Sequence, residues 1–121
     1  AELWLVTLDG SESEWRLTYT EALDYDPVWS PVDDLIAFVS EQTGNGDIYI
    51  STPLGFDVQR ITINQDPADK HPTWSPDGQH LAYWSDANYG LRQVYVYDLE
   101  TGETRIVGGG PFNDWDPLWV K

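Results

Sequence analysis

Hydrophobic residues occur along this chain in short runs of three to six positions, separated by polar segments rich in Gly, Pro, Asn and Asp. The runs have the length and the β-branched and aromatic content of strands, and the intervening residues are those of tight turns. The sequence therefore predicts strands joined as antiparallel hairpins. Two consecutive units of four such runs occupy positions 27–30, 35–40, 47–51 and 58–63, then 73–75, 81–85, 94–97 and 104–107.

A four-residue phrase marks the start of each unit. It occurs three times at intervals of 45 residues, and a tryptophan always follows two positions after its proline. Self-similarity with a period of roughly 40 to 50 residues is typical of repeat proteins built from small antiparallel sheets. The three copies are Asp24-Tyr25-Asp26-Pro27 with Trp29, Asp69-Lys70-His71-Pro72 with Trp74, and Asp114-Trp115-Asp116-Pro117 with Trp119.

The second run of the first unit, at positions 35–39, is apolar at every residue. A sheet with one face in water alternates, so continuous apolarity predicts neighbouring sheets on both faces. One length difference interrupts the period, since Tyr49 and Tyr95 are 46 residues apart whereas Arg60 and Arg105 are again 45 apart. We expect the hairpin turns to absorb this residue and to leave the strand register unchanged.

The phrase Asp-x-x-Pro-x-Trp-Ser-Pro-Asp-Gly, complete at positions 69–78, resembles the repeat of TolB-type β-propellers, which also occurs in the propeller domains of prolyl and dipeptidyl peptidases. Positions 24–33 match it with Val32-Asp33 in place of Asp-Gly, and positions 114–119 match its first half. The resemblance covers nearly the whole chain. It implies an all-β fold of four-stranded antiparallel blades around an axis, with the tryptophan-bearing strand innermost in each blade.

Counting strands in this frame predicts an incomplete ring. The opening residues match the third strand of a unit and the chain ends within the first strand of another, which makes about two and two-thirds blades, whereas closed propellers have roughly four to eight. We expect a part of a longer propeller, with assembly from copies of the chain or an open stack as alternatives. Ring closure then needs the remaining blades or other copies. The expected segments are a second half-blade at 1–23, complete blades at 24–68 and 69–113, and a first strand at 114–121.

The charge balance narrows the range of partners. Six Lys and Arg against 21 Asp and Glu give a formal net charge of −15, which repels phosphate backbones and anionic lipids. Nucleic acid and membrane are therefore not expected as partners. Cysteine is absent, which rules out disulfides and thiolate metal sites.

Within the repeated phrase, some positions vary while their neighbours stay constant. The second position is Tyr25, Lys70 or Trp115, and His71 interrupts a set of aspartates at the third. Such positions can carry recognition in a repeat protein, although they can equally face a neighbouring blade. The candidate binding residues are Tyr25, Asp26, Lys70, His71, Trp115 and Asp116.

The constant positions are interpreted as structural, because every blade needs its fold-making residues whereas a catalytic residue is needed once. The first aspartate is expected to cap a turn, the proline to fix φ, and the tryptophan to enter the core, as is Trp4. Trp15 and Trp84 fall outside the fixed pattern, and either residue can lie at the edge of a sheet. The structural set is Asp24, Pro27, Trp29, Asp69, Pro72, Trp74, Asp114, Pro117 and Trp119.

Three further features carry weaker expectations. A recurring arginine in the fourth strand is interpreted as edge protection by charge, at Arg16, Arg60 and Arg105. His71 and His80 can approach one another across a hairpin, which is a weak metal signal. A ring of aspartates at the channel mouth, Asp24, Asp26, Asp69, Asp114 and Asp116, offers oxygen ligands for a cation, although we expect neither a bound metal nor a cofactor.

No nucleophile elbow, phosphate-binding glycine loop, zinc-binding helix or cysteine nucleophile is present, so no catalytic residue is expected. The first hypothesis is a non-enzymatic scaffold that binds a protein or a peptide. The resemblance implies a bacterial protein outside the cytoplasm, in the periplasm. The alternatives are the propeller domain of a prolyl- or dipeptidyl-peptidase-like hydrolase, and a metal-dependent propeller enzyme such as a lactonase or lyase.

Overall fold

A computed structural model of the 121-residue chain describes residues 2–6, 13–19, 21–55, 57–62, 68–88 and 91–107. This part of the chain is built from strands and turns, and it has no helix long and apolar enough to cross a bilayer. The strands are β1 (Trp4–Val6), β2 (Glu14–Arg16), β3 (Asp24–Trp29), β4 (Ile36–Ser40), β5 (Asp47–Ser51), β6 (Gln59–Arg60), β7 (Asp69–Trp74), β8 (His80–Asn88), β9 (Leu91–Asp98) and β10 (Thr104–Ile106).

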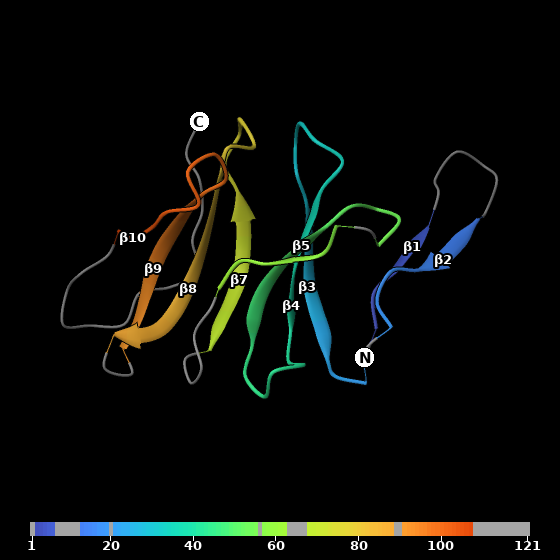
Figure 1. Cartoon of the computed structure of the whole chain (residues 1–121), viewed down its shortest axis with the longest axis horizontal. Coiled ribbons are helices and arrows are strands. Elements are labelled where there is room, and N and C mark those ends of the chain that lie inside the picture. Colours follow the sequence, from blue (N-terminus) through green and yellow to red (C-terminus); the bar gives the residue numbers. More distant parts are fainter. Residues whose placement is uncertain are drawn as a thin grey trace.

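The strands form three antiparallel sheets that stand side by side (Figure 1). β1 and β2 make a two-stranded half-blade, and the two complete blades have the orders β3-β4-β5-β6 and β7-β8-β9-β10. We call these the half-blade, blade 1 and blade 2. They confirm the predicted all-β class and the four-stranded blades, while the strand expected at 114–121 lies outside the described residues.

Stacking of the sheets buries their facing side chains. β4 is buried at every residue, as its continuous apolar sequence predicted. The interface between the half-blade and blade 1 consists of Leu3, Leu5, Leu17, Ile36, Phe38 and Tyr49. The interface between blades 1 and 2 consists of Ala37, Val39, Ile48, Ile50, Ile61, Trp74, Leu81 and Tyr83.

The inner tryptophans do not share one environment. Trp74 has 7% of its surface exposed, and its indole N–H donates to the main-chain carbonyl of Val28 on β3 at 3.1 Å. Trp29, the same position in blade 1, is 55% exposed, and Trp4 is 59% exposed. The expectation that Trp29 and Trp4 enter the core is therefore wrong. In the described part of the chain, no inner strands stand in front of blade 1 to cover Trp29, and β1, which carries Trp4, pairs with β2 alone. Trp119 lies outside that part.

A buried carboxylate joins the two outer strands of blade 1. Asp47 on β5 accepts hydrogen bonds from the hydroxyls of Thr43 and Thr62 and pairs with Arg60 on β6 at 3.0 Å. The half-blade repeats the arrangement with Glu2, which pairs with Arg16 and accepts from the hydroxyl of Thr18. Arg16 and Arg60 therefore form ion pairs with residues of the neighbouring strand. This is a role in addition to the edge protection that the sequence predicted.

Blade 2 departs from this arrangement through a shift of register. Arg16 and Arg60 lie opposite Trp4 and Tyr49, but Arg105 lies opposite Val96, and Ile106 takes the place opposite Tyr95. Arg105 follows Tyr95 by 10 residues whereas Arg60 follows Tyr49 by 11, and a slip of one residue turns each side chain to the other face. The extra residue before Tyr95 is absorbed at the end of the β8–β9 hairpin as expected, since Tyr83 lies opposite Tyr95 as Phe38 lies opposite Tyr49. The expectation is wrong for the β9–β10 hairpin, where the register shifts instead. A neutral residue, Gln93, occupies the place of the buried carboxylate.

Candidate functional site

The inner strands β3 and β7 begin next to one another at the lower end of the molecule in Figure 1. Four of the six candidate binding residues come together there, across the boundary between the blades. His71 Nδ1 lies 3.3 Å from Asp26 Oδ2, and both side chains are more than a third exposed. The structure thus joins the third positions of two consecutive phrases. Trp115 and Asp116 lie outside the described residues.

The second positions also meet, through a residue that the sequence did not single out. The Tyr25 hydroxyl donates to Glu41 Oε1 at 2.7 Å, and Lys70 Nζ lies 4.0 Å from the same oxygen. Lys70 Nζ also lies 5.5 Å from the centre of the Tyr25 ring, within the range of a cation–π contact. Sequence position could have pointed to Glu41, because it directly follows the second strand of blade 1. That strand ends at the same end of the blade where the inner strand begins.

Burial and the hydrogen bond to Glu41 both raise the pKa of Tyr25. The phenol therefore stays protonated at neutral pH and remains a hydrogen-bond donor. Together with Lys70 it leaves the Glu41 carboxylate with two favourable neighbours. We call Tyr25, Asp26, Glu41, Lys70 and His71 the inter-blade cluster.

Backbone geometry explains the residue types at the third position. Asp26 and His71 have positive φ angles of 53° and 56°, and each lies in an irregularity of the pairing between the inner and second strands. Asp, Asn and His tolerate this left-handed region far better than other side chains. The following prolines, Pro27 and Pro72, suit edge strands with such bulges because they cannot donate to a ladder. Local backbone conformation therefore accounts for the residue types found at this position.

Aromatic contacts extend the cluster into the second strand of blade 2. The His71 and Trp84 rings lie 5.8 Å apart, and the Arg92 guanidinium carbon lies 4.6 Å from the centre of the Trp84 ring. Trp84 is buried on the central strand β8, so it does not lie at an edge. Trp15 does lie on an edge strand, where its indole donates to the carbonyl of Pro53 at 3.0 Å.

The first aspartates of the two described copies of the phrase are not part of an open acidic ring. Asp24 and Asp69 are buried, whereas Asp26 is half-exposed and engaged with His71. The negative charge of Asp69 adds to burial in raising the pKa of Tyr83 and Tyr95. Within the described ranges, no three His, Cys, Asp or Glu side chains come together as a metal site.

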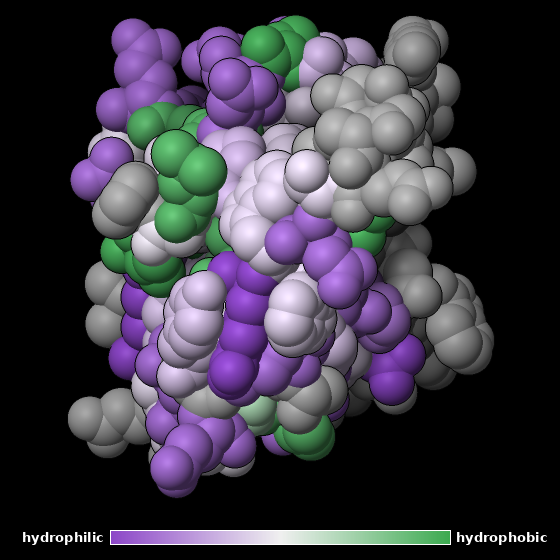
Figure 2. Space-filling model, turned by 90° about the vertical axis from the view of Figure 1, so that its right-hand side faces the viewer, coloured by the Kyte–Doolittle hydropathy of each residue, from purple (hydrophilic) through white to green (hydrophobic). Residues whose placement is uncertain are grey.

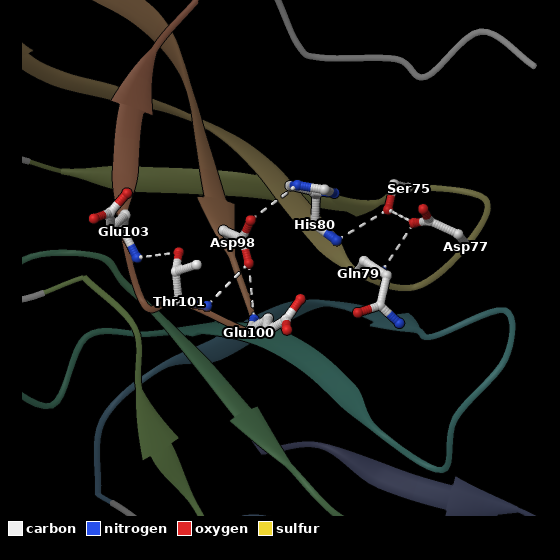
Figure 3. Close-up of polar contacts among 8 residues, drawn as sticks. All are labelled: Ser75, Asp77, Gln79, His80, Asp98, Glu100, Thr101 and Glu103. Atoms are coloured by element: carbon white, nitrogen blue, oxygen red, sulfur yellow. Dashed lines mark hydrogen bonds and ion pairs between the residues drawn. The ribbon is translucent and has the colours of Figure 1, made fainter.

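The opposite end of blade 2 is organised by turns (Figure 3). Asp77 accepts from the Ser75 hydroxyl at 2.6 Å and from the backbone N–H of Gln79 at 3.0 Å. Asp98 accepts from two backbone N–H groups of the next turn, and its other oxygen lies 3.3 Å from His80 Nε2. These bonds assign the Ser-Pro-Asp-Gly part of the phrase to turn formation. His80 begins β8 beside the end of β7, whereas His71 lies near the start of β7. The two histidines are therefore at opposite ends of this strand pair, and their expected approach is wrong.

The two described copies of the Asp-x-x-Pro-x-Trp phrase form the strands β3 and β7, each the first strand of a four-stranded blade. Residues 1–120 match the model of the TolB beta propeller domain family. The chain belongs to this family. Membership confirms the recognition made from the repeated phrase.

Known relatives of this TolB-type propeller chain include TolB homologues and peptidases by name. A "Protein TolB homolog" from Chlorobium luteolum is 36% identical over 80 residues, which cover 66% of this chain and 18% of that protein. An "Uncharacterized peptidase YuxL" from Bacillus subtilis is 33% identical over 101 residues, covering 78% of this chain and 15% of that protein. The chain therefore spans less than a fifth of the length of either relative.

Solved structures of the family superpose on nearly the whole chain. The structure titled "The structure of putative TolB from Agrobacterium tumefaciens" matches with a TM-score of 0.76 and 28% sequence identity. The match covers 98% of this chain and 46% of that one. The arrangement of half-blade, blade 1 and blade 2 is therefore that of consecutive blades in a larger propeller.

Proposed function

We propose that this TolB-type chain is a non-enzymatic scaffold that binds a protein or a peptide through the inter-blade cluster. The observation that carries the proposal is the meeting of Tyr25 and Lys70, which differ in identity between the repeats, at the same end as the Asp26–His71 pair. Residues that vary within a constant frame, and that remain partly exposed, suit recognition of a specific partner.

The chemistry of the cluster favours a polar polypeptide segment. Glu41 and Asp26 offer carboxylate acceptors, while Lys70, Tyr25 and His71 carry donor groups, all within one boundary between blades. Such a mixed set matches a backbone with alternating N–H and C=O groups better than a uniformly charged ligand. The net charge of −15 also disfavours nucleic acid and anionic lipid surfaces.

We further propose that the chain is a unit of a larger propeller, since it covers under a fifth of each of the two named relatives. Similarity to TolB proteins of bacteria supports a location outside the cytoplasm, in the periplasm. The remaining blades, or other copies, then close the ring. Trp115 and Asp116 are the second and third residues of the third copy of the phrase, and we propose that they play the same part at the boundary between blade 2 and the following blade.

A second candidate is the propeller portion of a peptidase. The 33% identity with the peptidase from Bacillus subtilis over most of this chain favours it. In that case the polypeptide that includes this chain also contains a Gly-x-Ser-x-Gly nucleophile elbow outside residues 1–121. Sequencing the complete reading frame distinguishes the two candidates, because the scaffold needs no such motif.

Selection of peptides from a displayed random library on the immobilised chain tests binding at the cluster. We expect enriched peptides whose affinity falls about tenfold or more in Tyr25→Ala and Lys70→Ala. Glu100→Ala, in the exposed β9–β10 turn, is the matched control and should bind as the unmodified chain does. Peptides that bind both cluster variants and the control equally would exclude the cluster as the binding site.

A further inference from the structure

The two ends of the row of sheets differ in chemistry. Figure 2 looks onto the half-blade end, where hydrophobic residues in green reach the surface between hydrophilic residues in purple. At the other end, Leu81 and Tyr83 of β8 face blade 1, so the alternation along the strand turns His80 away from blade 1. A hollow with a volume of 280 Å³ lies on that outward face. About nine water molecules fill such a volume, so it suits a small ligand.

The hollow is lined mainly by polar and ionisable side chains, and the repeat does not require them. Its lining includes His80, Val96, Asp98, Glu103 and Arg105. In blade 1, the places of His80, Asp98 and Arg105 are taken by the uncharged residues Leu35, Thr52 and Gln59. A residue that the fold needs recurs in every blade, whereas this set occurs in only one of the two complete blades that the structure describes. The fold alone therefore does not account for it.

The hollow lies at a rim that a neighbouring blade does not close. Blade 2 stacks against the corresponding face of blade 1. Even so, Gln59 remains exposed there, and Leu35 and Thr52 are only half-buried. The equivalent places on blade 2 therefore remain open to a ligand within a larger propeller as well.

One end of the hollow is anionic. Backbone N–H groups of Thr101 and Glu100 donate to Asp98 Oδ1 and, with the nearby His80, lower the pKa of Asp98, so this carboxylate is held in place and ionised at neutral pH. Glu103 stands opposite Asp98, whose backbone N–H donates to the Glu103 carbonyl at 2.9 Å. Figure 3 shows the two acidic side chains on either side of Thr101. Like charges on facing residues of two strands repel, so a cation is favoured between them.

The other end of the hollow is cationic. Arg105 follows Glu103 by two residues, which places their Cα atoms about 7 Å apart along the strand. Its guanidinium is exposed and forms no ion pair with another side chain of the described residues. A guanidinium with free N–H groups binds a carboxylate through two parallel hydrogen bonds. Val96, opposite Arg105 and two residues before Asp98, adds an apolar wall.

We propose that this hollow binds an ω-amino carboxylate. The ammonium group of the ligand lies between Asp98 and Glu103, its carboxylate pairs with Arg105, and its aliphatic stem packs against Val96. A phosphate or another anion is disfavoured by the two carboxylates, and a simple cation by the guanidinium. Lysine offers this chemistry both as a free amino acid and as the last residue of a polypeptide. The hollow lies at the other end of blade 2 from the inter-blade cluster, so the proposal does not depend on peptide binding there.

Titration of the 121-residue chain with ε-aminocaproate, followed by NMR of the backbone amides, tests the proposal. We expect saturable shifts of the Thr101 and Arg105 signals, while the signals of the inter-blade cluster stay unchanged. Hexylamine and hexanoate each carry only one of the two charges. They should bind about tenfold or more weakly than ε-aminocaproate, because each leaves one end of the hollow without its partner.

Substitutions in the turn separate specific pairing from general attraction. Glu103→Gln and Arg105→Ala should each weaken the binding of ε-aminocaproate about tenfold or more. Both side chains are exposed, so the fold should be kept. Glu100→Gln is the matched control, since Glu100 is an exposed acid of the same turn that does not line the hollow. This variant should bind as the unmodified chain does.

Two further probes distinguish the sources of the ligand. N-acetyl-L-lysine keeps the carboxylate and the side-chain ammonium, as the last residue of a polypeptide does, whereas L-lysine adds an α-ammonium beside the carboxylate. Tighter binding of one or the other identifies the polypeptide end or the free amino acid as the source. Hexylamine binding as tightly as ε-aminocaproate, or equal losses in Glu103→Gln and Glu100→Gln, would show only attraction of cations to an acidic surface and overturn the proposal. Absence of saturable shifts with ε-aminocaproate and both lysine probes overturns it as well.

Discussion

Arg60 Nη2 lies 3.0 Å from Asp47 Oδ2, and the Asp47 side chain has no exposed surface. The carboxylate also accepts from the hydroxyls of Thr43 and Thr62, and the Thr62 hydroxyl in turn accepts from the backbone N–H of Ile48. One buried charge therefore organises the turn and the edge strand on either side of it. Removing one member leaves the others buried without full compensation.

Asp47→Asn should lower the free energy of unfolding by about 2 to 3 kcal/mol, because the arginine and the two hydroxyls lose their charged partner. Glu2→Gln is the control, since its pair with Arg16 is more exposed and its loss should cost about 1 kcal/mol or less. Urea unfolding of the full chain measures both. Equal losses for the two variants would contradict the distinction drawn from burial.

The register slip of β10 predicts opposite behaviour for two arginines that align in sequence. Arg105→Ala should change the free energy of unfolding by no more than about 0.5 kcal/mol, because Arg105 is an exposed residue opposite Val96. Arg60→Ala removes the partner of a buried carboxylate and should cost about 3 kcal/mol. A comparable loss at both positions, measured by urea unfolding, would show that Arg105 also clamps its blade.

The same slip predicts that a carboxylate is not tolerated at Gln93. Gln93→Asp places a charge at a fully buried position whose arginine faces the other side of the sheet, and it should cost about 3 kcal/mol or more. One residue inserted into the β9–β10 turn returns Arg105 to the face of position 93. Combined with Gln93→Asp, that insertion should recover part of the loss in urea unfolding, and a further loss of stability would contradict the assigned register.

The positive φ angles predict which substitutions the third position of the phrase accepts. Asp26→Val should be about 1 to 2 kcal/mol less stable than Asp26→Gly, because a β-branched side chain is disfavoured in the left-handed region. His71→Val and His71→Gly should differ in the same direction. Lys70→Val against Lys70→Gly is the control, where the strand conformation favours valine instead. Thermal unfolding distinguishes these outcomes.

Acid should weaken the turn that follows β9. Hydrogen bonds from the backbone N–H groups of Thr101 and Glu100 and the nearby His80 lower the pKa of Asp98. A lowered pKa in the folded state means that the ionised carboxylate stabilises the fold above its ordinary pKa, and that this contribution disappears as the pH falls through the lowered value. Melting temperatures of the unmodified chain and Asp98→Asn, recorded from about pH 6 to about pH 2, should converge toward the acid end. A constant difference would contradict the prediction.

The fold was predictable from sequence because the repeated phrase carries both a spacing and a strand identity. Burial of Trp74 and the continuous burial of β4 followed from that pattern. The exposure of Trp29 did not follow from the pattern. A repeat predicts how a residue packs when a blade stands on either side, but it does not predict whether the neighbouring strands are present. The slip of β10 was visible as a one-residue difference, but sequence alone could not decide whether a turn or a strand takes it up.

The inter-blade cluster was predictable only in part. Tyr25, Asp26, Lys70 and His71 were marked by variation within a constant frame, whereas Glu41 joins them through a different strand end. No spacing connects Glu41 to Lys70, because their contact depends on the angle at which two blades stack. The contribution of Asp26 and His71 to backbone geometry likewise required φ angles that residue types only suggest.

The Trp74–Val28 contact joins opposite faces of successive blades, so each blade presents one matching surface on either side. In a structure of this kind stability depends on each unit and its nearest neighbours. A tandem duplication of one 45-residue period would insert a unit whose two flanks already fit its new surroundings. Gene duplication and unequal crossing-over can therefore change the size of such a ring without inventing a new contact.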